Sequence, residues 1–227
     1  MKYWMACTVA VCLSVVCNAQ AAEGVGVEQG GLGADPTSRE VREHSNFSVN
    51  AVWAPLNFPF PLATGLNANY VASGNWMLGV DYTRSSQAIK VFSYELGELN
   101  EQNLTLQARR FYGNSFNLKM GIGHRRTQAH LSQNFFDLTQ TSYAATASEL
   151  RSNFFRFGFG NQWQFSKKYT LVVDWFTVNI PFNAYVETSA SQFANSSSSK
   201  QDIENAENIL KYYPSGSVAQ LEVGLIF

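Results

Sequence analysis

Residues 217–227, SVAQLEVGLIF, decide the fold of this chain. Apolar side chains alternate there with polar residues or glycine, and Ile226 is the one apolar residue on the polar side. A period of two residues is typical of a β-strand whose two faces meet different surroundings. A wholly apolar outer face suits a strand that contacts lipid on one side and the lumen of a barrel on the other. The predicted lipid-facing side consists of Ala219, Leu221, Val223, Leu225 and Phe227.

The N-terminal residues have the features of a secretory signal peptide. Lys2 supplies a positive charge, residues 5–16 form an apolar stretch, and residues 19–21 offer a small-residue cleavage site. The apolar stretch is too short to span a membrane as a helix. We therefore predict that residues 1–21 are removed when the chain is exported.

The composition of the remaining chain limits its chemistry. All three cysteines lie at positions 7, 12 and 17, so the exported part has neither disulfides nor thiolate metal ligands. The formal net charge of the whole chain is −1, which argues against nucleic acid as a partner. No apolar run after residue 22 reaches the length of a transmembrane helix, so we expect any membrane span to consist of strands.

Short polar turns and long polar segments divide the chain into eight expected strands. The turns lie at 73–75, 113–115 and 166–168, and the long Ser-, Asn- and Gln-rich segments lie near 86–101, 131–147 and 184–215. Short turns on one side and long loops on the other are typical of transmembrane barrels. The expected strands span 46–54, 62–72, 76–86, 102–112, 116–129, 149–165, 169–182 and 217–227.

The faces of these strands favour a barrel over a soluble sheet. A soluble β-sandwich also has one apolar and one polar face. Here, however, aromatic residues gather at strand ends beside the short turns, as in the girdle at a membrane interface. The sequence therefore predicts an all-β fold over residues 46–227. We expect an antiparallel up-and-down transmembrane barrel of eight strands with both termini in the periplasm.

Two polar segments outside the expected strands are less regular. Residues 22–45 are rich in glycine and polar residues, which predicts a flexible periplasmic segment or a strap that enters the lumen. In the long segment 184–215, apolar residues recur at helical spacing from Ile203 to Tyr213, before Pro214. This pattern predicts either a short amphipathic helix at the barrel mouth or a solvated loop.

Charged residues occupy the face that the alternation turns toward the lumen. An eight-stranded barrel is just wide enough for side chains to fill it. Charges in so narrow a space must pair, because an unpaired buried ion costs several kcal/mol. The near balance of signs predicts a network that closes the lumen, and a binding or conducting role is the alternative. The predicted lumen charges are Asp81, Arg109, Lys119, Arg125, Arg156, Asp174 and Glu222.

From about residue 46 onward, the chain resembles the small eight-stranded outer-membrane proteins of Gram-negative bacteria, which include the OmpA-, OmpX- and OmpW-like proteins. The resemblance rests on the alternation that ends at Phe227, and more loosely on the sequence GNQW at 160–163 followed by Asp174-Trp175 and Pro181. It implies a place in the outer membrane, contact with lipid and lipopolysaccharide, and delivery by the barrel-assembly machinery. Leu221, Val223, Leu225 and Phe227 would form the assembly signal.

The function expected from these features is structural or surface-interacting, with long loops that meet an extracellular partner. A narrow channel or transporter for small molecules, including hydrophobic ones, is the first alternative. A lipid-modifying enzyme is the second, and it depends on His124, because such enzymes use a histidine with a serine and a carboxylate. The sequence contains no dinucleotide loop, phosphate-binding loop or HExxH pattern. We predict no catalytic, cofactor or metal site, and the sequence indicates no oligomeric state.

Overall fold

The computed structural model describes residues 36–91, 94–131, 147–165, 167–188 and 197–227. These residues form nine strands in one antiparallel sheet and two helices. The strands are β1 (Phe47–Ala54), β2 (Leu56–Phe58), β3 (Ala63–Ser73), β4 (Trp76–Val91), β5 (Tyr94–Tyr112), β6 (Phe116–Leu131), β7 (Ala147–Phe165), β8 (Tyr169–Thr188) and β9 (Ser215–Ile226), and the helices are α2 (Ser38–Glu43) and α4 (Ser197–Tyr212). The predicted signal peptide and the central part of the expected loop 131–147 lie outside the described residues.

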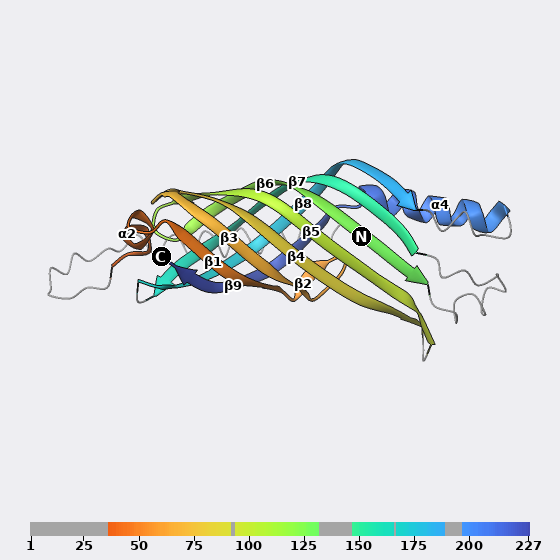
Figure 1. The fold of residues 1–227 in the computed structure, drawn as a ribbon, viewed down its shortest axis with the longest axis horizontal. Coiled ribbons are helices and arrows are strands. Elements are labelled where there is room, and N and C mark those ends of the chain that lie inside the picture. Colours follow the sequence, from red (N-terminus) through yellow and green to blue (C-terminus); the bar gives the residue numbers. More distant parts are fainter. Residues whose placement is uncertain (1–35, 92–93, 132–146, 166, 189–196) are drawn as a thin grey trace, which may run out of the picture. The chain divides into compact units, whose positions relative to one another are not determined.

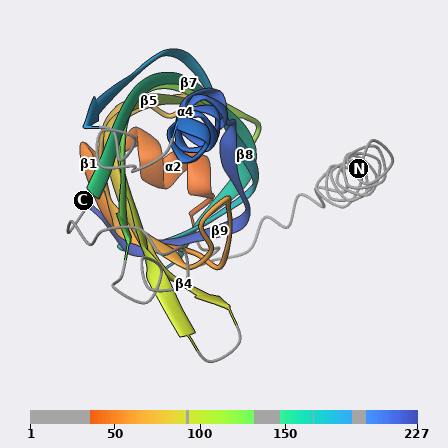
Figure 2. The same cartoon turned by 90° about the vertical axis from the view of Figure 1, so that its right-hand side faces the viewer.

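The sheet closes on itself as a barrel. Strand order around it is β1-β3-β4-β5-β6-β7-β8-β9, and β1 also pairs with β9. The remaining strand, β2, pairs with β9 beyond the end of β1. Figure 1 shows the tilted strands from the side, and Figure 2 shows the ring from the end at which α4 lies. The predicted antiparallel eight-stranded barrel is thereby confirmed.

The segment 86–101, expected as a loop, is instead a long paired hairpin. β4 continues to Val91 and β5 begins at Tyr94, with Ser85 opposite Glu101 and Ala88 opposite Glu98. The sequence hides this extension because backbone hydrogen bonds need no apolar side chains. Alternation is required only where one face of a strand meets lipid. The prediction of a loop over residues 86–101 was wrong for this reason.

The two faces of the strands have the polarity that alternation predicts. In β9, Val223 and Leu225 are exposed on the outer face, while Glu222 and Ile226 are buried. The register of β8 and β9 stays the same along their length, but the pairing skips one position on each strand between Asp174↔Gln220 and Phe176↔Val218. Ala219 lies at this irregularity with a φ of 55°, in the left-handed region. Beyond this irregularity, the residues that face inward change parity.

Exposed aromatic side chains ring the end of the barrel that carries the short turns. Phe47 packs against Tyr70 and Phe227, with ring centroids 5.5 and 6.4 Å apart. Aromatic rings of this kind mark the boundary between lipid tails and headgroups. The exposed aromatic residues of this ring are Phe47, Tyr70, Tyr112, Phe165, Tyr169 and Phe227.

Helix α2 fills the barrel end beside the short turns. Thr37 and Glu40 form a capping box that starts the helix, with Thr37 N donating to Glu40 Oε2 at 2.7 Å. Val41 then packs in a buried apolar cluster with residues that include Met77 and Phe111. The segment 22–45 was predicted to be either a flexible periplasmic segment or a strap that enters the lumen, and its described residues include this packed helix. The other residues of that segment, up to 35, lie outside the described part of the chain.

Helix α4 lies at the opposite end of the barrel and contacts β7 and β8 (Figure 1). It ends at Tyr212, just before Pro214, which cannot continue a helix. The helical alternative for the segment 184–215 is therefore the one that the structure contains. Neither of the two described helices combines the length and the apolarity that a membrane span requires.

The loss of stability caused by a charged residue on the outer face should depend on its depth in the membrane. Phe157 lies mid-strand on β7 and Phe165 lies at the turn end, and they are 51% and 52% exposed. We expect Phe157→Arg to lower the free energy of unfolding in lipid vesicles by about 2–4 kcal/mol, and Phe165→Arg by about 0–1 kcal/mol. Chemical denaturation of both variants measures the difference. Equal costs at the two positions would contradict the assigned depth.

Candidate functional site

The seven predicted lumen charges are all buried on the inner face of the barrel. None of their side chains is more than 4% exposed. They form three groups at different levels of the lumen. The first group is Arg109, Lys119, Asp174 and Glu222, the second is Asp81 and Arg156, and the third is Arg125 alone.

The first group, called here the charge quartet, joins four strands across the lumen. The guanidinium of Arg109 donates both of its terminal nitrogens to Asp174, at 2.8 and 3.1 Å, and one of them also to Glu222. Lys119 Nζ lies 2.6 Å from Asp174 Oδ2 and 3.5 Å from Glu222 Oε1. Each cation therefore contacts both carboxylates. The bidentate Arg109–Asp174 geometry is the strong form of such a pair.

The register explains why the quartet must be complete. Arg109 and Lys119 are direct partners on the adjacent strands β5 and β6, where two like charges repel. Asp174 and Glu222 come from the adjacent strands β8 and β9. In the closed ring, β5 and β9 lie on opposite sides. Attraction across the lumen thus offsets repulsion along each wall, and the barrel must close to bring the opposite charges together.

The second and third groups form no ion pair with the quartet among the described residues. Arg156 Nη1 donates to Asp81 Oδ1 at 3.0 Å, and Arg156 Nε donates to Asn179 Oδ1 at 2.8 Å. Arg125 pairs with no carboxylate among the described residues. It donates to Ser152 Oγ and to the backbone oxygens of Lys211 and Tyr213, at 3.0, 3.3 and 3.0 Å. These carbonyls end helix α4, where a cation also complements the helix dipole.

Three buried charges of the described residues, Arg42, Glu101 and Glu207, escaped the sequence prediction because they lie in segments expected to be irregular. Glu101 is 1% exposed on the inner face of β5, within the expected loop 86–101. Arg42 is fully buried in α2 and donates to the backbone oxygens of Gly74 and Asn114, both at 2.9 Å. The capping-box pattern at Thr37 and Glu40 was the available signal for α2.

Arg42 joins α2 to the barrel through both charge and packing. Its guanidinium lies 3.8 Å from the ring centroid of Phe111, a cation–π contact. Burial lowers the pKa of Arg42 to about 10, so the side chain remains positive at neutral pH. Ser38 Oγ, on the same helix, accepts from Gln164 N at 3.0 Å. Helix α2 thereby contacts the hairpins β3–β4 and β5–β6 and the end of β7.

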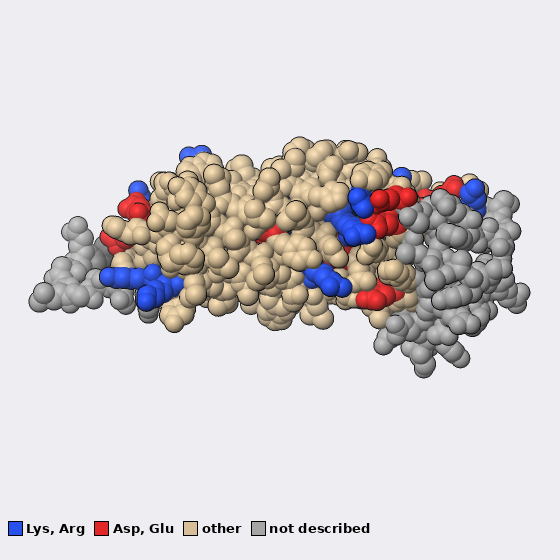
Figure 3. Space-filling view, viewed as in Figure 1, with Lys and Arg blue, Asp and Glu red and all other residues tan. Residues whose placement is uncertain are grey.

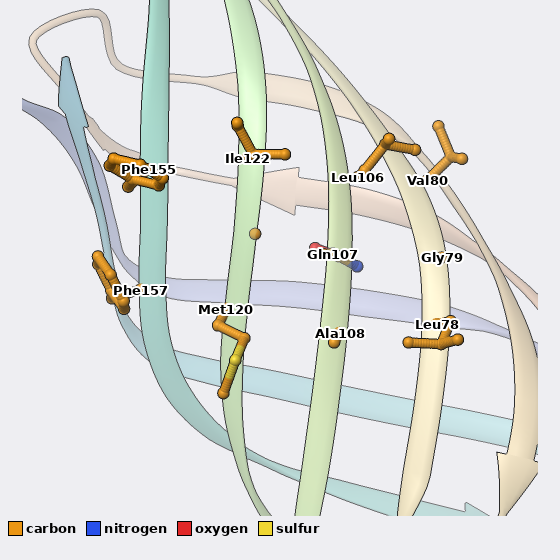
Figure 4. Close-up of a pocket in the computed structure, with 11 residues that line it drawn as sticks. Leu78, Gly79, Val80, Leu106, Gln107, Ala108, Met120, Ile122, Phe155 and Phe157 are labelled. Carbon is orange, nitrogen blue, oxygen red and sulfur yellow. The ribbon is translucent and has the colours of Figure 1, made fainter. Parts of the chain in front are cut away.

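The outer surface has far fewer charged and polar groups than the lumen. On the face shown in Figure 3, charged atoms gather toward the two ends and the surface between them is mostly uncharged. A shallow apolar groove crosses β4 to β7 there, where small Ala108 lies between Leu78 and Met120 (Figure 4). Its one polar lining side chain, Gln107, is buried from the inner face. The groove has no polar group that could orient a ligand.

The other predicted residues lie as follows. Val223, Leu225 and Phe227 are exposed on the outer face and Leu221 is half-buried, and their role as an assembly signal stays a prediction. His124 lies on β6 with Nδ1 2.9 Å from Asn153 Oδ1. No group of histidine, cysteine or acidic residues suited to a metal ion occurs in the described part of the chain.

Comparisons with known proteins agree with this architecture. No family model matches the chain, and no curated protein matches it. A major outer membrane protein of Thermus thermophilus has a TM-score of 0.50 and 12% identity, over 81% of this chain and 99% of that protein. Ail, the attachment invasion locus protein of Yersinia pestis, has a TM-score of 0.47 and 10% identity, over 81% and 97% of the two chains. The N-terminal β-barrel domain of Pseudomonas aeruginosa OprF has a TM-score of 0.45 and 10% identity, over 81% and 98%.

At identities this low, the similarity supports a shared fold and gives no information about a shared function. This chain closes through β1 and β9 and has an apolar outer face and a polar, charged lumen. The chain has the fold of the small outer-membrane β-barrel proteins.

Removal of one quartet cation should leave two carboxylates buried without it. We expect Arg109→Met to lower the free energy of unfolding by about 3–5 kcal/mol. Glu222→Gln in the same chain should restore part of this loss, because it removes one of the two carboxylates that would otherwise share the single cation Lys119. A double-mutant cycle measured by denaturation in vesicles gives the coupling. Strict additivity of the two changes would contradict the quartet.

Proposed function

We propose that this protein is an outer-membrane β-barrel with a structural or surface-interaction role and a lumen closed to solutes. The single observation that carries the proposal is the charge quartet, whose four side chains are at most 1% exposed and bond across the lumen. An eight-stranded barrel filled by paired side chains leaves little room for a continuous water path.

The two ends of the barrel add to this closure. Helix α2 occupies the end with the short turns, held by Arg42 and Ser38. At the other end, α4 is bonded to the wall through Arg125 and through Ser148 Oγ, which donates to Glu207 Oε1 at 2.8 Å. Figure 2, viewed along the barrel, shows both helices projecting within the ring of strands. The quartet and α2 are therefore two successive barriers, which support a structural role over a conducting one.

The α4 end is the better candidate for meeting an extracellular partner. The paired hairpin of β4 and β5 and the helix α4 extend the barrel there (Figure 1). Ile209 and Tyr212 of α4 are 66% and 58% exposed. Exposed apolar residues on an extended element suit contact with another surface. We propose that this end faces outward and that both termini lie in the periplasm, with lipid and lipopolysaccharide around the apolar band.

Conductance tests the closed lumen against the channel alternative. In planar bilayers, we expect the refolded protein to show no steady current. Arg109→Ala removes the side chain that bridges the lumen, so brief openings should appear, limited by α2. Phe165→Ala, on the outer face of the barrel, is the matched control and should stay silent. Steady channels in the unaltered protein would establish the transporter instead.

Surface labelling tests the proposed orientation. The sequence has cysteines only at positions 7, 12 and 17, so an introduced thiol in the barrel can be followed. On intact cells, a membrane-impermeant maleimide should label Ile209→Cys on α4 and leave Lys168→Cys, at a short turn, unlabelled. Permeabilised cells should show labelling of both variants. The reverse pattern on intact cells would invert the orientation.

A further inference from the structure

Three polar side chains gather on the lumen face of β4 and β5. Glu101 lies directly opposite Ser85, and Asn103 follows Glu101 two residues along the same face of β5. Ser85, Glu101 and Asn103 are 3%, 1% and 5% exposed. These three residues are called the oxygen cluster here. It lies between the charge quartet and the end of α4, and the quartet does not use any of its members.

Each member of the cluster has a buried oxygen without a hydrogen-bond partner among the described residues. These atoms are Ser85 Oγ, Glu101 Oε2 and Asn103 Oδ1. The Asn103 amide donates its nitrogen to the other carboxylate oxygen, Glu101 Oε1, at 2.8 Å. This bond fixes the carboxylate and leaves only oxygens unused. Buried polar atoms in native proteins are normally paired with protein, water or a bound group.

Arg125 and Glu101 attract each other electrostatically, but the nitrogens of Arg125 form their hydrogen bonds with other residues. Arg125 lies opposite Asn103 on the neighbouring strand β6. Its three guanidinium nitrogens donate to Ser152 and to the carbonyls that end α4. The other acidic group on this side, Glu207 of α4, accepts from Ser148. Glu101 is therefore a buried carboxylate that has no ion pair with a described residue.

We propose that the oxygen cluster binds one small cation. A carboxylate, an amide oxygen and a hydroxyl are the donors that hard metal ions such as Ca²⁺, Mg²⁺ or Na⁺ prefer, with water completing the shell. The same three acceptors suit the N–H groups of a compact organic ammonium ion. Both kinds of ligand are small cations that bind oxygen atoms, either as a hard metal ion or through N–H groups. The site goes beyond the closed-barrel role and would exist whether or not the quartet blocks conduction.

Stability measurements with defined cations test the site. The full barrel in detergent is titrated with CaCl₂, MgCl₂, NaCl or methylammonium chloride. Tetramethylammonium chloride keeps the ionic strength constant, because its bulky cation has no N–H group. A ligand that binds only the folded state raises the unfolding midpoint in a saturable way. We expect such a rise with at least one probe. The metal and methylammonium arms distinguish the two sources of the charge.

Variants separate the site from general salt effects. Glu101→Gln should raise the midpoint without added cation, because it removes an unpaired buried charge, and should abolish the cation response. Ser85→Ala removes an oxygen that has no partner, so it should fold normally and weaken the apparent affinity about five- to tenfold. Glu98→Gln, on the outer face of the same strand, is the matched control and should respond fully.

The outcomes that overturn the proposal are equally distinct. The site is absent if no probe gives a saturable rise in the unaltered protein. It is also absent if Glu101→Gln keeps the response, or if Glu98→Gln loses as much of it as Glu101→Gln. Should Glu101→Gln fail to fold, the same comparison between Ser85→Ala and Glu98→Gln decides the matter.

Discussion

Attraction between opposite charges across the lumen is the interaction on which the rest of this barrel depends. Arg109 and Lys119 are neighbours on one wall, and Asp174 and Glu222 come from neighbouring strands on another. Each wall alone would be strained by like charges, and burial would make that strain severe. Only the closed ring brings the two walls together. The quartet therefore makes closure specific as well as favourable, because a slip of one residue in any of the four strands would turn a charge toward lipid.

Buried charged side chains also hold the two described helices at the barrel ends. At one end, the buried guanidinium of Arg42 donates to two turn carbonyls and lies over the face of Phe111. At the other end, Arg125 is satisfied by the carbonyls that end α4. In both places an arginine joins a helix to the wall through backbone oxygens. Because both arginines donate to backbone oxygens, neither of them forms an ion pair with a carboxylate among the described residues. Glu101 therefore has no ion pair with Arg125.

Sequence alone predicted the barrel because lipid imposes a simple rule on every spanning strand. The alternation assigned outer residues such as Val223 and all seven predicted lumen charges to the faces on which they lie. The alternation did not predict the structure of segments that have no face in contact with lipid. The hairpin over 86–101 needs no apolar face, and α2 is too short for a periodic pattern. The pairing of charges was also beyond the sequence, because which cation meets which carboxylate depends on strand tilt and on the irregularity at Ala219.

The position of α2 has a consequence for the order of events in folding. Its contacts come from Gly74, Asn114 and Gln164, which lie in three different hairpins of the ring. Those hairpins are far apart in the sequence, so the surface that receives α2 exists only after the strands have assembled around it. A helix that precedes every strand in the sequence is thus held by hairpins that all follow it.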